Sequence, residues 1–209
     1  QPVQGFSGLL RDGDDWLVLE DNGYGTKANS GDFLLRVVRV RIDTATQQTT
    51  VLEGGFSLSD PDHRLPFPLT RSDRRLTGAD LDPESFQRMP DGTFWIGEEF
   101  GPSLVHVDAQ GRVLAAPVLP DGVRAPESWD LGGAAPTLGG SKGFEGMALG
   151  VDGHTLYPML EGAVAGDDPA TRRMYSFDTR RGTYTGLKAK VRFEVPGDAL
   201  GDMVALDQN

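Results

Sequence analysis

The sequence predicts an all-β protein, a β-propeller built from four-stranded antiparallel blades. Short alternating apolar runs are separated by Asp-Gly or other glycine-containing turns, which is the pattern of paired strands. One order of runs, turns and acidic residues recurs along the chain, and propeller blades repeat in this way. The 28 glycines and 14 prolines among 209 residues also suit many short strands and turns.

The central repeat occupies residues 80–114. Its second apolar run ends in Glu98 and Glu99, and Asp108 closes its third run. The strands expected in this repeat are Ser85–Met89, Thr93–Ile96, Ser103–Val107 and Arg112–Leu114. Four strands in this order form one up-and-down antiparallel sheet.

The same plan appears before and after the central repeat. The strands expected in the first copy are Gly5–Leu10, Trp16–Leu19, Phe33–Ile42 and Gln47–Leu52. Those expected in the later copy are Gly143–Leu149, Thr155–Leu160, Arg173–Phe177 and Lys188–Val195. A further copy begins at Gly201. The alternative is a β-sandwich whose hairpins resemble one another by accident.

We expect a single propeller domain over residues 1–209. Its blade-like units cover about 5–55, 82–122 and 143–196, residues 200–209 begin another unit, and residues 56–79 form an insertion loop. Propellers close with about four to eight blades. Three units and the start of a fourth therefore predict an incomplete propeller, with more blades beyond one or both ends. The alternative is an intact fold of 209 residues.

The composition restricts the classes of partner. Lys and Arg total 20 against 31 Asp and Glu, a net charge of −11, which argues against nucleic acid or an anionic membrane as the main partner. The same balance fits a cation-binding surface. Cysteine is absent, which excludes disulfides and thiolate metal sites. No apolar run approaches the ~20 residues that a membrane-spanning helix needs, so no membrane insertion is expected.

Acidic residues recur where the blades meet. The copies align at Ser7, Glu84, Glu145 and Asp202, at the start of the strands expected to line the channel. Carboxylates that converge there repel one another unless a cation or shared protons intervene. Oxygen ligands without His or Cys favour Ca²⁺ or Mg²⁺.

The candidate metal ligands are Asp21, Asp82, Glu84, Glu145 and Asp202, and Glu84 and Glu145 are also the candidate catalytic residues. The alternative is that the acids accept backbone N–H groups of the next blade. That alternative stays open for Glu84 and Glu145, and it is favoured for three further acids, Glu98, Glu99 and Glu161.

Basic residues near the expected channel mouth are candidate contacts for an anionic substrate. They are Arg71 and Arg74 in the insertion and Lys142 before the third unit; a solvated loop is the alternative for the insertion. Ser141 lies in a G-x-S-x-G string at residues 139–143. A nucleophile elbow needs a strand before this string and a helix after it, whereas here a loop precedes and a strand follows.

Three motifs resemble those of the phytase-like domain family, called "esterase-like activity of phytase" proteins. They are Asp82-Pro-Glu-Ser, residues 90–103 and Lys142-Gly-Phe-Glu-Gly-Met-Ala, while Gly5-Phe-Ser-Gly and Glu20-Asp-Asn-Gly are similar to an upstream motif. Ser85 departs from the glycine usual in the family. The resemblance implies a bacterial β-propeller, possible hydrolysis of phosphate or other esters, and an extracellular or periplasmic location, although this segment carries no signal peptide.

Two hypotheses of function follow. The first is a metal-dependent hydrolase of a small-molecule ester or phosphoester, with Asp82, Glu84 and Glu145 as ligands or general base. The second is a non-catalytic propeller that binds a ligand or a protein, with acids that are structural or hold Ca²⁺. The sequence leaves open whether the protein is an enzyme, and it leaves the substrate and the oligomeric state open.

Overall fold

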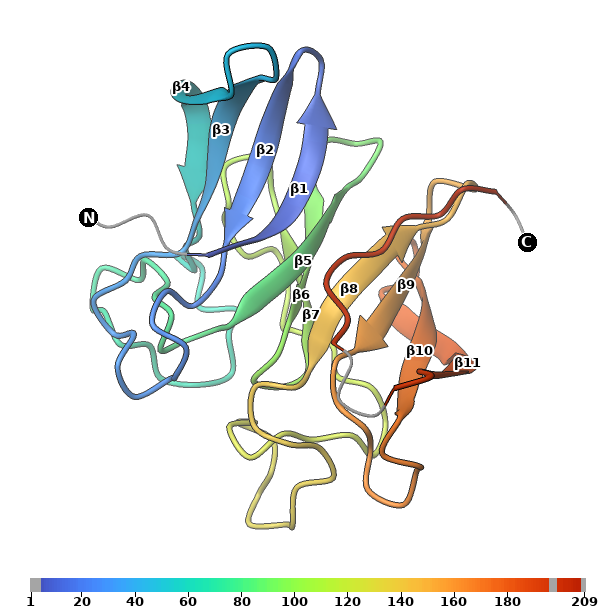
Figure 1. The fold of residues 1–209 in the computed structure, drawn as a ribbon. Helices are drawn as coiled ribbons and strands as arrows, with labels where there is room; N and C mark the ends of the chain where they lie inside the picture. The colour runs from blue at the N-terminus through green and yellow to red at the C-terminus, as the bar shows by residue number, and fades with distance from the viewer. Residues whose placement is uncertain (1–4, 196–198, 208–209) are drawn as a thin grey trace.

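The computed structural model describes residues 5–195 and 199–207 as three antiparallel β-sheets joined by long loops (Figure 1). The first sheet contains β1 (Phe6–Asp12), β2 (Asp15–Glu20), β3 (Arg36–Asp43) and β4 (Gln48–Ser57). The second contains β5 (Pro83–Arg88), β6 (Phe94–Glu98) and β7 (Ser103–Val107). The third contains β8 (Phe144–Leu149), β9 (Thr155–Leu160), β10 (Thr171–Asp178) and β11 (Thr183–Arg192). In these ranges no helix has the length and apolar character to span a bilayer.

The sheets are arranged as neighbouring blades. Within each sheet the strands follow sequence order outward from β1, β5 or β8. These first strands lie side by side, β1 against β5 and β5 against β8 (Figure 1). The Ser85 hydroxyl donates to the Phe144 carbonyl at 3.2 Å, and the Gln87 amide donates to the Met147 carbonyl at 2.7 Å. The prediction of a β-propeller whose first strands are innermost is confirmed.

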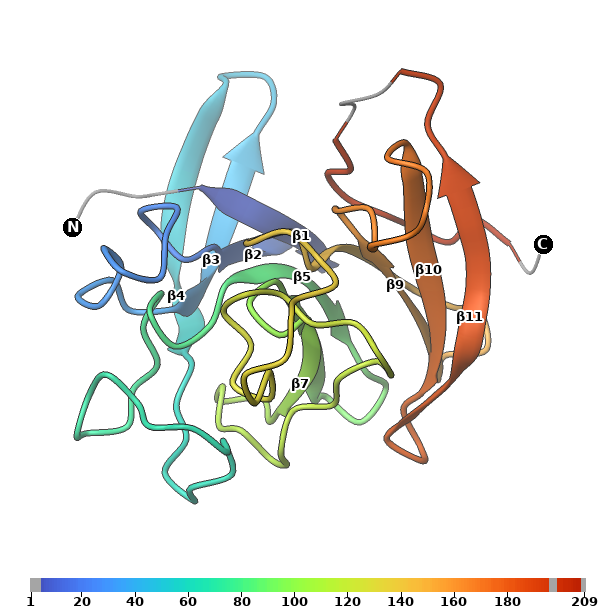
Figure 2. The ribbon, with the colours of Figure 1, turned by 90° about the horizontal axis from the view of Figure 1, so that it is seen from below.

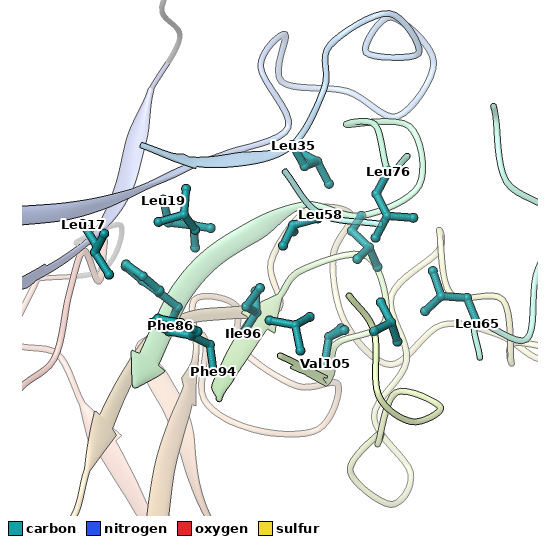
Figure 3. Packing of buried hydrophobic residues seen from close by; sticks show 14 of the residues in the cluster. Leu17, Leu19, Leu35, Leu58, Leu65, Leu76, Phe86, Phe94, Ile96 and Val105 are labelled. Carbon is teal, nitrogen blue, oxygen red and sulfur yellow. The ribbon is translucent and has the colours of Figure 1, made fainter. Parts of the chain in front are cut away.

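Two apolar cores lie between successive blades. Leu17 and Leu19 of β2 pack with Phe86 and Ile96 of the central blade, and Leu76 of the insertion joins the same cluster (Figure 3). The other core lies between the second and third blades and includes Trp95, Phe144, Met147, Leu156 and Phe177. Because each blade buries its faces against its neighbours, packing fixes the relative positions of the innermost strands.

The aspartate that ends each third strand forms the following turn. The carboxylates of Asp43, Asp108 and Asp178 each accept the backbone N–H two residues ahead, at 2.9, 2.8 and 2.9 Å. Such local hydrogen bonds from the backbone to a side chain compete with continuation of the strand and favour a turn. This bond explains why an aspartate recurs at that place in all three repeats.

The central sheet has three strands, so the prediction of a fourth strand at Arg112–Leu114 is wrong. Val113 makes only an isolated bridge with Val107, and Val118 makes another with Leu104. Ser59 of the insertion donates its N–H to Gly111 at 2.9 Å and accepts the N–H of Val113 at 2.9 Å. The insertion thus pairs with the outer edge of this segment, while on its inner edge Leu114 donates its N–H to the His106 carbonyl of β7 and the Arg112 carbonyl accepts the N–H of Asp108.

Several strand limits differ from the expected ones. The third strand begins at Arg36 rather than Phe33, because Leu34 forms an isolated bridge with Thr77 of the insertion. The fourth strand continues through a register shift to Ser57, so that the insertion starts after Ser57. The last strand is Thr183–Arg192 rather than Lys188–Val195.

Residues 199–207 contain no strand in the structure, and the prediction that residues 200–209 begin another unit stays a prediction. Leu200 and Met203 instead pack near Gly146 of β8, beside the third blade. No second strand pairs with this segment in the described ranges, so its backbone has no ladder to join. The expected unit limits at 196 and 208–209 lie outside the described residues.

One end of the blades carries the longest loops. Viewed from below, residues 115–142 cross the end at which β5 and β8 begin (Figure 2). Val123 and Leu138 anchor this loop on the core between the second and third blades. Ala125 donates its N–H to the Gly101 carbonyl at 3.1 Å. Packing and hydrogen bonds therefore hold the loop at the end where the acidic residues converge.

Gly143 permits the third blade to approach the second. A Cβ at this position would lie 2.4 Å from the Glu99 Cα, a backbone atom that cannot rotate away. We expect Gly143→Ala to lower the free energy of unfolding by about 3 kcal/mol through overpacking. Urea unfolding should then show a midpoint lower by roughly 1 M.

Gly201→Ala is the matched control, since no atom of the described residues lies within 4 Å of a Cβ built there. Equal urea midpoints for the two variants would contradict the close approach assigned to Gly143.

Candidate metal centre

Each innermost strand contains a β-bulge at the same place. The pairing with the second strand shifts between Phe6 and Gly8, between Pro83 and Ser85, and between Phe144 and Gly146. The bulged residues are therefore Ser7, Glu84 and Glu145, the residues that the sequence repeats align. A bulge bends the strand and re-aims the side chain of the extra residue. Three blades thus use one backbone irregularity at equivalent positions.

A second set of equivalent acids follows the second strand of each blade. Phe6, Pro83 and Phe144 pair with Glu20, Glu98 and Leu160. The residues that come next in the chain are Asp21, Glu99 and Glu161. The strands run antiparallel, so these residues lie at the same end of the blades as the bulges. Each blade consequently contributes residues from two strands to that end.

Acids of the two sets, together with Asp82, meet in two overlapping carboxylate triads. Asp82, Glu84 and Glu99 form the first triad, and Glu99, Glu145 and Glu161 form the second. In each triad, one oxygen of every residue lies within 4.8 Å of the others. Glu99 belongs to both triads. The first lies within the central blade and the second joins the central blade to the third.

Two of these carboxylates are buried without full hydrogen bonding. Asp82 is 2% exposed and Glu99 is 4% exposed. Among the described residues, Asp82 Oδ1 and Glu99 Oε1 each lack a hydrogen-bond partner, although Glu84 and the Asn22 N–H lie close enough to Asp82 to lower its pKa. A buried polar oxygen without a partner is costly, and a carboxylate more so. These oxygens belong to the two residues that would anchor a cation in the first triad.

The pKa values show how strongly this site disfavours negative charge. Burial, followed by the charge of Asp82, raises the pKa of Glu84 to about 10 and that of Glu99 to about 9. Burial and the charge of Glu161 raise the pKa of Glu145 to about 7. Burial likewise raises the pKa of Asp82. With these pKa values, Glu84 and Glu99 carry protons at neutral pH when no cation is present. A bound cation would take the place of those protons.

Lys142 is the basic residue that pairs with this cluster. Its ammonium group forms an ion pair with Glu161. Burial lowers the pKa of Lys142, but the hydrogen bond and charge of Glu161 outweigh that effect and raise it. Five carboxylates in the two triads therefore face one ammonium group. The oxygen-only ligand set and the excess negative charge fit a hard divalent cation such as Ca²⁺.

Asp21 and Asp202 lie at the edges of the cluster and belong to neither triad. Burial raises the pKa of Asp21, and its carboxylate accepts the Gly23 N–H at 2.7 Å. The negative charge of Asp21 contributes to the raised pKa of Asp82. Asp202 is exposed, and its negative charge contributes to the raised pKa of Glu145. Asp202 and Glu145 also line a groove of about 510 Å³ beside β1.

Glu98 is fully buried but turns away from the cluster. Its carboxylate accepts the N–H groups of Phe100 and Gly101 at 2.9 Å each and the Ser103 hydroxyl at 2.6 Å. Burial raises its pKa to about 7. The expected backbone-capping role fits Glu98, although it caps its own turn rather than the next blade.

The two candidate arginines of the insertion have carboxylate partners within the insertion. Arg71 pairs with Asp73 at 2.7 Å and Arg74 pairs with Asp60 at 2.5 Å. Among the three candidate anion contacts, Lys142 is therefore the one that the structure places in the cluster.

Glu99 and Glu161 are the triad residues that the sequence analysis assigned to a structural role. Both follow the second strand of a blade, as Asp21 does in the first blade. Aligning the blades on the end of that strand would have grouped them. The direction of their side chains depends on the register set by the bulges, which the sequence pattern does not reveal.

The raised pKa values predict an unusual pH dependence without divalent cations. Between pH 4.5 and about 9, folded Glu84 and Glu99 hold protons that the unfolded chain has lost. The free energy of unfolding should therefore fall as pH rises. Urea unfolding in EDTA at pH 5.5 and 8.5 would measure this slope, and Glu99→Gln should flatten it.

Glu53→Gln, at an exposed position of β4, is the control and should keep the wild-type slope. Burial lowers the pKa of His106. This residue therefore makes the free energy of unfolding rise with pH, and it does so in all the variants. A wild-type slope no steeper than that of Glu99→Gln would contradict the raised pKa of Glu99.

Comparison with known proteins finds a family match that covers the whole chain. The family description "Phytase-like: Esterase-like activity of phytase" matches residues 1–209. An "Uncharacterized secreted protein" of Arthroderma benhamiae is 28% identical over 111 residues, which cover 44% of this chain and 22% of that protein.

Solved structures are similar at low identity. The Dos1 propeller is 12% identical, with 97% of this chain and 40% of that chain covered and a TM-score of 0.43. A protein of unknown function from Bacteroides thetaiotaomicron is 13% identical, with 98% and 43% covered and a TM-score of 0.45. The chain thus spans less than half the length of these structures. By its match over residues 1–209, the chain belongs to the phytase-like family described as esterase-like activity of phytase.

Proposed function

We propose that the protein is a divalent-cation-dependent hydrolase of esters or phosphoesters. The observation that supports this most directly is the pair of carboxylate triads that share buried Glu99. Asp82 Oδ1 and Glu99 Oε1 have no hydrogen-bond partner among the described residues, so both buried oxygens are open to a cation. The family description supplies the reaction class, since it names an esterase-like activity.

Ca²⁺ is the proposed cation. It takes six to eight oxygen ligands in flexible geometry, and carboxylates from several segments can supply them together with water. Asp82, Glu84 and Glu99 would hold it in the buried first triad, and the second triad, in which Glu145 reaches the groove, would lie beside it. When bound, the cation would polarise an ester or phosphoester oxygen and lower the pKa of a bound water.

Glu145 is the proposed general base. It is half-buried, lines the groove, and has its pKa raised to about 7 by burial and by Glu161. A base with a pKa near the working pH transfers protons efficiently. Glu84, whose pKa is raised to about 10, suits a ligand better than a base.

Substrate contacts are proposed at the mouth of this site. Lys142 would attract an anionic group, because its side chain is partly exposed beside the second triad. Arg71 and Arg74 would contribute only after giving up their partners Asp73 and Asp60. Secretion is part of the proposal, since the relative from Arthroderma benhamiae is described as secreted.

A non-catalytic propeller is the second candidate. The second triad takes Glu99 from one blade and Glu145 and Glu161 from the next. A cation held there would cross-link two blades, and the resulting rigid surface would serve ligand binding. Both candidates bind the cation, but only the hydrolase turns over a substrate.

Calorimetry and turnover assays together test both candidates. We expect Ca²⁺ uptake in the protein after EDTA treatment, with Glu99→Gln at least about 10-fold weaker because it removes a shared ligand. Hydrolysis of p-nitrophenyl acetate and p-nitrophenyl phosphate should require Ca²⁺ and fall by at least 10²-fold in Glu145→Gln.

The exposed variant Glu53→Gln should behave as wild type in both assays. Ca²⁺ uptake without turnover of either ester would reject the hydrolase and favour the cross-linked propeller. Absence of Ca²⁺ uptake by the wild-type protein would reject both.

A further inference from the structure

Ser141 has a backbone conformation that non-glycine residues rarely adopt. Its φ is +44°, in the left-handed region. The chain around it is held firmly: Gly162 donates its N–H to the Lys142 carbonyl at 3.0 Å, and Glu161 donates its N–H to the Gly143 carbonyl at 2.8 Å. Gly143 also packs against the backbone of Glu99. The surroundings therefore maintain a conformation that costs of order 1 kcal/mol or more.

The hydroxyl of Ser141 donates a hydrogen bond to Asp82 Oδ2 at 2.6 Å. This bond crosses from the segment before β8 to the segment before β5. It occupies one carboxylate oxygen of Asp82, a residue of the first triad, and leaves Oδ1, which has no hydrogen-bond partner in the described part of the chain. A bond to one oxygen of a carboxylate fixes the orientation of the other.

We propose that Ser141 is a positioning residue, which holds the Asp82 carboxylate so that Oδ1 faces a cation in the first triad. The proposal rests on the cation site of the proposed function and adds a residue that touches neither cation nor substrate. Outer-shell hydrogen bonds of this kind typically change metal affinity by 10- to 100-fold when removed.

The local geometry also explains why a serine is useful here. Glycine would adopt the left-handed conformation without a steric cost, but it has no donor for Asp82. A strained conformation at a functional site is maintained where the side chain is needed. A nucleophile role fits less well, because the hydroxyl proton points to Asp82 and a strand, not a helix, follows the G-x-S-x-G string.

Two substitutions separate the hydroxyl from the strain. Ser141→Gly removes both, so it should weaken Ca²⁺ binding about 10-fold or more while changing the urea midpoint in EDTA little, because the relieved strain offsets the lost hydrogen bond. Ser141→Thr keeps the hydroxyl but places a β-branched side chain at positive φ. It should keep Ca²⁺ affinity within about 3-fold of wild type while lowering the urea midpoint.

A role limited to folding would move affinity and stability in the same direction, so the opposite responses of the two variants are the decisive readout. Ser72→Gly, in the exposed part of the insertion, is the control and should leave Ca²⁺ affinity unchanged.

Wild-type Ca²⁺ affinity in Ser141→Gly would overturn the proposal while leaving the cation site intact. Covalent labelling of Ser141 by a fluorophosphonate, found by mass spectrometry, would overturn it in favour of a nucleophile. Absence of Ca²⁺ uptake by the wild-type protein would overturn both this proposal and the proposed function.

Discussion

Mutual repulsion of buried carboxylates is the constraint around which this structure is arranged. Five acids share two overlapping triads at one end of the blades, and Lys142 supplies one ammonium group. Water is largely excluded from Asp82 and Glu99, so neither solvent nor salt screens their charges well. Such a cluster persists only where protons or cations neutralise it and where other interactions hold its members together. The rest of the fold supplies those other interactions.

The apolar cores between blades set the positions of the acids before any ligand is considered. Leu19 and Phe86 pack on one side of the central blade, while Trp95 and Phe144 pack on the other. Bulges then turn selected side chains of the innermost strands toward one end. Stability thus comes from the inter-blade faces, and the acidic end is a local cost that these faces offset.

Much of this organisation could be predicted from the sequence, because it depends on local patterns. The turn aspartates and the recurring order of strands identified the blades, and repeat alignment identified Glu84 and Glu145. The features that the sequence did not predict depend on contacts between residues that are far apart in the chain. The segment at Arg112–Leu114, for example, forms isolated bridges both with β7 and with Ser59 of the insertion. Glu99 and Glu161 meet only because two blades pack at a particular register, which no local pattern encodes.

Glu99 has a consequence for the thermodynamics of the centre, because one carboxylate serves two triads. An ion or proton that binds Glu99 in one triad changes the electrostatic field in the other triad, and therefore its affinity for a cation. Such coupling is reciprocal in free energy, whichever triad fills first. The groups on either side then titrate with shared macroscopic constants, and an uptake curve would depart from independent sites.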